Sequence, residues 1–308
     1  MERQLIDWIV FWVIFALLFF IDLFISERRN EKISLKSSLI WSTIWTIAAL
    51  IFNVFIYYSL GKDRAVEFLA GYLIERSLSF DNLFVFLLIF QVMNVSAKNQ
   101  PHVLKWGILS AIVFRIIFIL AGVGLVNLFE PVIYVFGVIL LYAAYKMAFG
   151  GEQKIDVENN WLVKLANRYL NFDPSYKGKK FFITKDKKKF ATTIFLTFLL
   201  IESSDIVFAV DSIPAIIAIT KDAFIIISSN IFAILGLRAL YFALAALVDI
   251  FVYLKYGVAI ILFYVGIKML ISDWVHISTE TSLIVIMTLL TASILLSLLH
   301  KKLVKEKD

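Results

Sequence analysis

Nine runs of apolar residues, each long enough to cross a lipid bilayer, follow one another through the 308-residue sequence. A helix needs about 20 apolar residues to span roughly 30 Å of hydrocarbon. Because lipid offers the backbone no hydrogen-bond partners, and these runs are too long and too continuously apolar for barrel strands, we expect helices. The predicted fold is an all-α polytopic membrane protein with about nine transmembrane helices. The runs cover residues 8–25, 38–60, 66–92, 102–127, 130–149, 190–214, 223–247, 254–271 and 281–299.

Composition and charge agree with this class of protein. Hydrophobic residues make up 61% of the chain and the mean hydropathy is +0.88, whereas soluble proteins hold about 45–50% apolar residues. The loops on one side of the predicted helices carry 21 lysines and arginines, and those on the other side carry 4. By the positive-inside rule, the N-terminus is expected outside and the C-terminus in the cytoplasm, in the plasma (inner) membrane. These loops explain the net charge of +6, so no nucleic-acid partner is predicted.

A long polar connection over residues 150–189 divides the chain. Its segment "WLVKLANRYL" places Trp161, Leu165 and Tyr169 on one face of a helix and Lys164 and Arg168 on another. This pattern is typical of a helix that lies in the membrane interface, although a solvated linker is an equal alternative. The predicted organisation is two peripheral helices in 1–60, a first three-helix repeat in 61–149, the basic cytoplasmic linker with its interfacial helix in 150–189, a second repeat in 190–272, and a last helix with a basic tail in 273–308.

The two halves share an order of features rather than many identities. "ERSLSFDNL" at 75–83 and "DIVFAVDSI" at 205–213 both have an acid, five residues, and then Asp followed by Asn or Ser. Each acidic segment is followed by a run with an arginine, Arg115 or Arg238, and by a run that ends with a lysine, Lys146 or Lys268. Three helices per repeat would place the second copy upside down in the membrane. The pattern therefore predicts a 3+3 inverted repeat, an architecture common in secondary transporters.

Five acids lie inside the two acidic runs, where charge is expensive. An ionised side chain at a helix centre costs about 2.5–3.5 kcal/mol. Purely structural ion pairing is the weaker interpretation, because two central arginines cannot neutralise five acids. A bound divalent cation would balance the remaining charge. The acids are Glu75, Asp81, Glu202, Asp205 and Asp211, and the predicted counter-charges are Arg115 and Arg238.

The ligands available to such a cation are hard oxygens. Besides the carboxylates, the amide of Asn82 and the hydroxyl of Ser212 follow the two aspartates directly. This donor set suits Mn²⁺, Mg²⁺ or Ca²⁺ as the bound substrate ion. Protons compete for the same oxygens, so coupling of transport to protons is a further hypothesis.

Convergence of these acids requires a distorted helix. Asp205 and Asp211 are six residues apart, as are Glu75 and Asp81, and so differ by about 120° around a straight helix. Pro214 removes a backbone donor and is therefore the predicted helix break in the second acidic run.

The segments "ERSLSFDNLFVF" at 75–86 and "GKKFFITKDKKKFATTIFLTFLLIESSDIVFAVDSIPAIIAIT" at 178–220 resemble the TerC family of bacterial membrane proteins, which is grouped with LysE-type exporters. The resemblance runs from about residue 8 to 300, with one departure, "ATT" where the family has Ala-Thr-Pro. It implies metal-ion homeostasis, with Mn²⁺ export as the activity and an older association with tellurite resistance. The family's acidic motifs map onto Glu75, Asp81, Asn82, Glu202, Asp205, Asp211 and Ser212. The choice of manganese rests on this resemblance.

Other functions remain as alternatives. One is a non-transporting partner that delivers metal to secreted enzymes, the secretion machinery or the stress response, and a lesser one is an amino-acid exporter. An enzyme is not expected, because neither half has a Gly-x-Gly-Asp stretch and the chain lacks HExxH. The expected partners are the divalent ion and the lipid bilayer, with a homo-oligomer as a further option.

Overall fold

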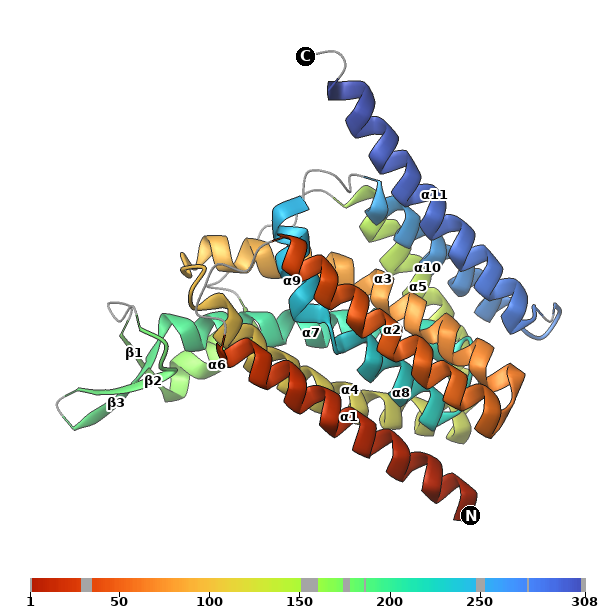
Figure 1. Ribbon diagram of the computed structural model, residues 1–308, viewed down its shortest axis with the longest axis horizontal. Helices are drawn as coiled ribbons and strands as arrows, with labels where there is room; N and C mark the ends of the chain where they lie inside the picture. The colour runs from red at the N-terminus through yellow and green to blue at the C-terminus, as the bar shows by residue number, and fades with distance from the viewer. Residues whose placement is uncertain are drawn as a thin grey trace.

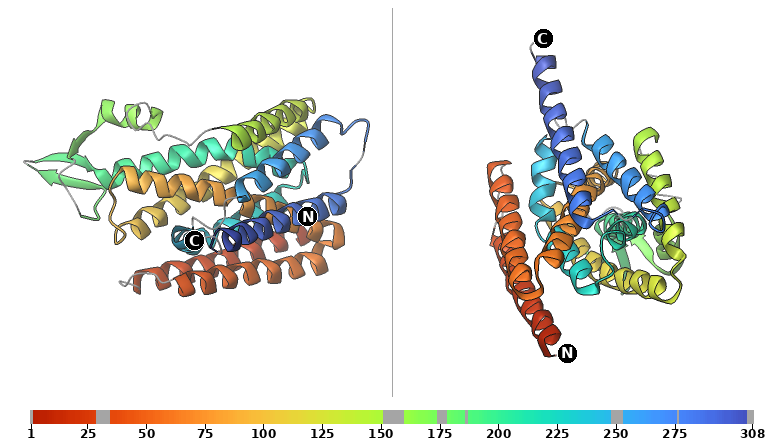
Figure 2. Two further views of the ribbon diagram at one scale, coloured as in Figure 1. Left: turned by 90° about the horizontal axis from the view of Figure 1, so that it is seen from above. Right: turned by 90° about the vertical axis from the view of Figure 1, so that its right-hand side faces the viewer.

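The computed structural model of the chain describes residues 2–28, 35–150, 160–173, 178–185, 187–247, 253–275 and 277–305. It is an elongated bundle of helices with a small sheet projecting from one end, here called the sheet end (Figures 1 and 2). The opposite end is called the far end. In chain order the elements are α1 (Glu2–Arg28), α2 (Leu35–Leu60), α3 (Lys62–Val92), α4 (Gln100–Leu128), α5 (Val132–Phe149), α6 (Trp161–Tyr169), β1 (Asn171–Asp173), β2 (Phe182–Lys185), β3 (Lys188–Thr192), α7 (Thr193–Ile217), α8 (Ala223–Ile234), α9 (Leu237–Leu247), α10 (Leu254–Leu270) and α11 (Thr279–Lys305).

The long helices coincide with the predicted apolar runs, and one run is split between α8 and α9. Among the described residues, six helices are long and apolar enough to cross a membrane, and the bent α8–α9 pair raises this number to seven. α3 falls outside this set because every stretch of 18 residues in it holds at least three charged residues, and α10 because it has 17 residues. The all-α polytopic fold is confirmed, whereas nine spans remain a prediction.

The centre of the bundle is formed by α3, α4, α7 and α8, which pack against one another. Every residue of α8 from Phe224 to Ile234 is buried. A helix that is apolar all round is stable only when other helices surround it. α8 therefore lies at the core, with α3 and α4 packed against it.

α5 and α10 form the most extensive helix pair. The pair depends on two glycines at their crossing point. A Cβ added to Gly137 would lie 3.1 Å from the carbonyl oxygen of Gly266, and one added to Gly266 would lie 3.0 Å from the carbonyl oxygen of Gly137. Small residues let helices in lipid approach this closely.

α1 and α2 form a layer along one side of the bundle (Figure 2). α2 packs on α3, α8 and α9, and α1 contacts α8. The two helices are also joined to each other, because Ser59 donates a hydrogen bond to the buried Asp7 at 2.6 Å. α11 packs on α10 and α3. The peripheral position of the first two helices and the last one stays a prediction.

The helix break lies in α8–α9 rather than at Pro214. α8 and α9 meet at 41°, and Gly236 between them has a φ of +103°, in the region that favours glycine. A Cβ there would lie 2.8 Å from Cβ of Trp45 on α2. α7 instead continues through Pro214 to Ile217, so the predicted break is wrong. Pro214 lies in the last turn, where the helix loses one backbone bond and then ends.

The linker folds into α6 and a three-stranded sheet of order β1-β3-β2. β1 pairs parallel with β3 and β2 pairs antiparallel with it. The side chain of Asn160, at the start of α6, bonds Ser203 of α7, while Asn171 just after α6 pairs with Phe190 before α7. α6 thus runs alongside the first half of α7, antiparallel to it, and does not lie across the bundle as the in-plane interpretation expected.

Candidate cation site

α7 carries its three acids on two different faces. Glu202 and Asp205 are three residues apart and share one face, whereas Asp211 is nine residues from Glu202 and thus about 180° around the helix. Glu202 and Asp205 are buried. Because α7 is unbroken over this stretch, one ion cannot contact all three carboxylates in this conformation.

Arg115 of α4 joins four helices through one guanidinium. Its side chain is 2% exposed and forms a close ion pair with Glu75 of α3, which is fully buried. Its Nη2 lies 3.5 Å from Oδ1 of Asp205, and its Nη1 donates to Asn230 of α8 at 3.2 Å and to Ser212 of α7 at 3.4 Å. A charge this deeply buried is tolerated because it is paired and hydrogen-bonded.

Glu202 lies on α7 one turn before Asp205 and is 3% exposed. Within the described part of the chain, neither of its carboxylate oxygens has a hydrogen-bond partner. The hydroxyl of Ser110 on α4 lies beside this carboxylate but donates to the backbone carbonyls of Trp106 and Gly107. An uncompensated buried carboxylate is costly and marks a functional site by default.

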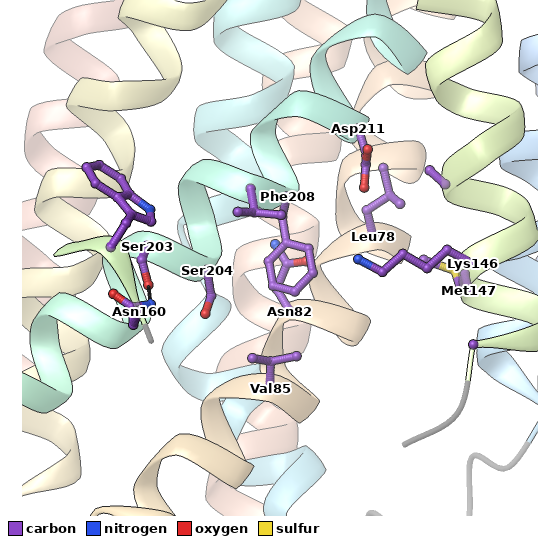
Figure 3. Close-up of a pocket in the computed structure, with 14 residues that line it drawn as sticks. Leu78, Asn82, Val85, Lys146, Met147, Asn160, Ser203, Ser204, Phe208 and Asp211 are labelled. Carbon is purple, nitrogen blue, oxygen red and sulfur yellow. Dashed lines mark hydrogen bonds between the residues drawn. The ribbon is translucent and has the colours of Figure 1, made fainter. Parts of the chain in front are cut away.

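Asp211 faces a pocket of about 510 Å³ between α3, α5 and α7, near the start of α6. Figure 3 shows Asp211 from α7, Asn82 from α3 and Lys146 from α5 directed toward the same space. Ser203, Ser204 and Asn160 add polar groups to its lining. We call this pocket the sheet-end pocket. It combines one carboxylate, one ammonium and several neutral oxygens.

The predicted site residues therefore separate into two groups. Glu75, Asp205 and Ser212 surround Arg115, with Glu202 one turn away, and Asp211 and Asn82 line the sheet-end pocket. The side chain of Asp81 lies outside the described residues. Among the described side chains, no group of three or more His, Asp or Glu is positioned to hold a metal ion. A single five-acid site is not formed in this conformation.

Arg238 pairs with an acid of α1 instead of one on α3 or α7. Its Nη2 lies 2.7 Å from Oδ2 of Asp22 on α1, and the prediction of its partner is wrong. It comes two residues after the turn at Gly236, and the bend there takes α9 away from the direction of α8. Asp22, an acid within the first apolar run, was the signal that sequence reasoning passed over.

Arg76 is buried, and none of the described residues that bond its guanidinium is an acid. Its guanidinium donates to the carbonyl of Ala233 at 3.0 Å and to Ser42 at 2.9 Å. Ala233 is in the last turn of α8, where carbonyls lack helical partners and carry partial negative charge. The helix break thus supplies the counter-charge for this arginine.

Two functional candidates were not found from the sequence. Asn230, in the buried "SSN" of α8, contacts Arg115, and Asn160 both caps α6 and donates to Ser203 at 2.6 Å. A buried Asn in an apolar helix was a usable signal, because its amide must find a partner. Asn160 carried no such signal, since it lies in a polar linker.

A second pocket, of about 620 Å³, lies at the far end of the bundle. It is lined by the starts of α3 and α5 and the ends of α7 and α10, among them Arg64, Tyr134, Thr220 and Lys268. We call it the far-end pocket. The later part of α3 and the end of α5 line the sheet-end pocket, whereas the beginnings of the same two helices line the far-end pocket. The two pockets therefore lie at opposite ends of the bundle.

Buried charges at the centre of a bundle of spanning helices define a polytopic helical membrane protein with an intramembrane polar site. The sequence profile of the integral membrane protein TerC family matches residues 60–307. The chain belongs to this family.

Curated relatives cover most of the chain. It is 45% identical over 259 residues to an "Uncharacterized membrane protein" of Rickettsia bellii, covering 84% of this chain and 85% of the relative. It is 45% identical over 254 residues to "Uncharacterized membrane protein STKORF319" of Myxococcus xanthus, covering 82% and 80%. It is 42% identical over 257 residues to the "Putative membrane-bound redox modulator Alx" of Escherichia coli K12, covering 81% and 80%. No solved structure gives a significant match.

Proposed function

We propose that this protein is a membrane transporter for a hard divalent cation, and that it exports Mn²⁺ from the cytoplasm. The observation that carries the proposal is Glu202, a buried carboxylate without a hydrogen-bond partner among the described residues. Arg115 already serves Glu75 and Asp205. Negative charge therefore remains inside the bundle, and a cation is its simplest complement.

The packing supports an inverted repeat of α3–α5 and α7–α10. Each helix of one unit packs against its counterpart: α3 on α7, α4 on α8, and α5 on α10. The contact of α4 with α7 is matched by that of α8 with α3. The far-end pocket indicates that α3 and α7 run in opposite directions, since Arg64 at the start of α3 and Ile217 at the end of α7 both line it. Such a two-fold relation across the membrane is the architecture of many secondary transporters.

Alternating access follows from the two pockets. The sheet-end pocket contains Lys146 and the far-end pocket contains Lys268, the two lysines that end the corresponding runs of the repeats. Asp211 and Asn82 would receive the ion from the sheet-end pocket, and Glu202 and Asp205 would hold it after α7 moves relative to α3 and α5. By the positive-inside rule the basic sheet end faces the cytoplasm, which makes this direction export.

The choice of ion combines the ligands with the family. Carboxylate, amide and hydroxyl oxygens suit Mn²⁺, Mg²⁺ and Ca²⁺, and the likeness to TerC-type exporters favours Mn²⁺. A role in redox balance, as the name of the E. coli relative suggests, would have to be indirect here. The sequence contains no cysteine, so the chain itself can carry out no thiol chemistry.

Mn²⁺ flux into proteoliposomes that contain only this purified protein tests the proposal. We expect flux above that of protein-free liposomes, and loss of most of that flux in Asp211→Asn. Asp63→Asn, at an exposed position of α3 that lines neither pocket, is the matched control and should transport like the wild type. Background flux for the wild type would instead favour a partner that binds metal without transporting it.

A further inference from the structure

The buried charges between α3, α4 and α7 carry a net charge that matches one divalent ion. Glu75, Asp205 and Glu202 are three acids with exposures of 0%, 5% and 3%, and Arg115 is the single base among them. Counted as ionised groups, they leave two negative charges. Arg76 does not alter this balance, because it turns away to α8 and α2.

Arg115 holds its two acids unequally. Its Nη1 forms a close ion pair with Oε2 of Glu75, whose other oxygen accepts from Ser79 at 3.2 Å. The contact with Asp205 is longer, 3.5 Å, at the limit of a hydrogen bond. Asp205 is therefore the acid that Arg115 can release at the smaller cost.

The oxygens around Arg115 form the shell that a hard cation would take. They are two carboxylates, the amide oxygen of Asn230 and the hydroxyl of Ser212. Such donors are those of Mg²⁺, Ca²⁺ and Mn²⁺ sites. The guanidinium stands where part of an ion's coordination sphere would lie, on the same face of α7 as the unpartnered Glu202.

We propose that Arg115 determines the valence of the transported ion. It remains paired with Glu75 and releases Asp205, so that Glu202 and Asp205 present two negative charges to one divalent cation. Without the ion, Arg115 returns to Asp205 and lowers the free-energy cost of burying that carboxylate unpaired. In this role Glu75 is the partner of Arg115 and not a ligand of the ion. The inference rests on the proposed cation transport and adds the residue that selects a charge of two.

A suppressor experiment separates this role from that of a ligand. In Glu75→Gln, Arg115 should engage Asp205 fully and leave one negative charge. Mn²⁺ affinity should then fall at least about 100-fold, on the scale of removing one partner of a buried charge pair. In Glu75→Gln with Arg115→Gln, both members of the neutral pair are gone, and Glu202 and Asp205 again supply two charges. Mn²⁺ affinity should return to within about 10-fold of the wild type.

The readout is thermal stabilisation of the purified protein by Mn²⁺ and, separately, by Na⁺. Stabilisation grows with ligand concentration over Kd, so it reports affinity without transport. In Glu75→Gln the ratio of Mn²⁺ to Na⁺ stabilisation should fall, and in the double variant it should recover. A purely structural role of Arg115 would not restore this ratio. Asp63→Asn serves as the surface control.

The outcomes distinguish the two levels of the proposal. Absence of Mn²⁺ stabilisation in the wild type contradicts the proposed function itself. If the wild type binds Mn²⁺ but both Glu75 variants bind it weakly, Glu75 is a ligand and the role of Arg115 is overturned. That role is also overturned if Glu75→Gln binds Mn²⁺ like the wild type. Should this double variant not fold, Glu75→Gln with Arg115→Met decides, because it removes the same two charges. Divalent binding within about 10-fold of the wild type supports the role of the charge, and its loss in folded protein contradicts it.

Discussion

Gly137 of α5 and Gly266 of α10 meet backbone to backbone. A Cβ added to either glycine would lie about 3 Å from the carbonyl oxygen of the other. The two glycines occupy the largest helix interface of the bundle. Because α5 precedes the 150–189 linker and α10 follows it, this crossing joins the two halves of the chain.

Gly266→Ala should therefore separate α5 from α10 and lower the melting temperature. Its Cβ would lie 3.0 Å from the carbonyl oxygen of Gly137, a backbone atom that cannot move alone, and overpacking of this kind costs about 1–3 kcal/mol. Gly124→Ala in α4 is the matched control, since no described atom lies within 4 Å of its added Cβ. Thermal unfolding in detergent measures both. Equal melting temperatures for the two variants would show that the glycine contact is unimportant.

Arg238→Gln should destabilise the attachment of α1. The pair with Asp22 is largely buried, and removing one member leaves the other charge in a low-dielectric setting at a cost of up to about 3 kcal/mol. Adding Asp22→Asn removes the stranded carboxylate, so the double variant should regain most of the lost stability. A double-mutant cycle on melting temperature measures the coupling, and additive effects of the two substitutions would argue against the pair.

Phe181→Ala should loosen the sheet from the helices. The ring of Phe181 packs against His102 at 5.2 Å and Phe198 at 5.4 Å between ring centroids, and so links the sheet to α4 and α7. Losing a packed phenylalanine costs about 3–5 kcal/mol in a full core and less at this half-buried position. Limited proteolysis should cut the 178–192 region faster in this variant. Tyr169→Ala, on the exposed surface of α6, is the control and should be cut like the wild type.

Mn²⁺ should bind more weakly in acid than at neutral pH. Protons and the ion compete for the same carboxylate oxygens, so metal binding releases protons. The sign is fixed: lowering the pH from about 8 to about 5.5 should raise the apparent Kd for Mn²⁺. Thermal stabilisation by Mn²⁺ at the two pH values measures the change. An unchanged affinity would exclude proton competition at the site.

The sequence was informative where a single physical term dominates. Long apolar runs placed the helices within a few residues, because lipid burial allows few other structures. The cost of buried charge indicated five acids together, of which the structure buries Glu75, Glu202 and Asp205. Arg115 was likewise expected to meet an acidic helix, and it contacts two.

The remaining features depend on tertiary packing, which one sequence does not encode locally. Both Gly236 and Pro214 interrupt apolar runs, yet the chain bends at Gly236, where Trp45 leaves no room for a side chain. The partner of Arg238 depends on where that bend directs α9. The amphipathic pattern of α6 showed that it has two faces, but the bond from Asn160 to Ser203 sets its direction along α7.

An anomalous difference map from crystals of the protein grown with Mn²⁺ tests the central claim most directly. The predicted result is a peak within coordination distance, about 2.0–2.3 Å, of carboxylate oxygens of α7, at Glu202 and Asp205 or at Asp211 in the sheet-end pocket. In crystals of Glu202→Gln, a peak at the first position should disappear. Anomalous peaks confined to surface carboxylates, with none beside α7 at saturating Mn²⁺, would contradict a cation site inside the bundle.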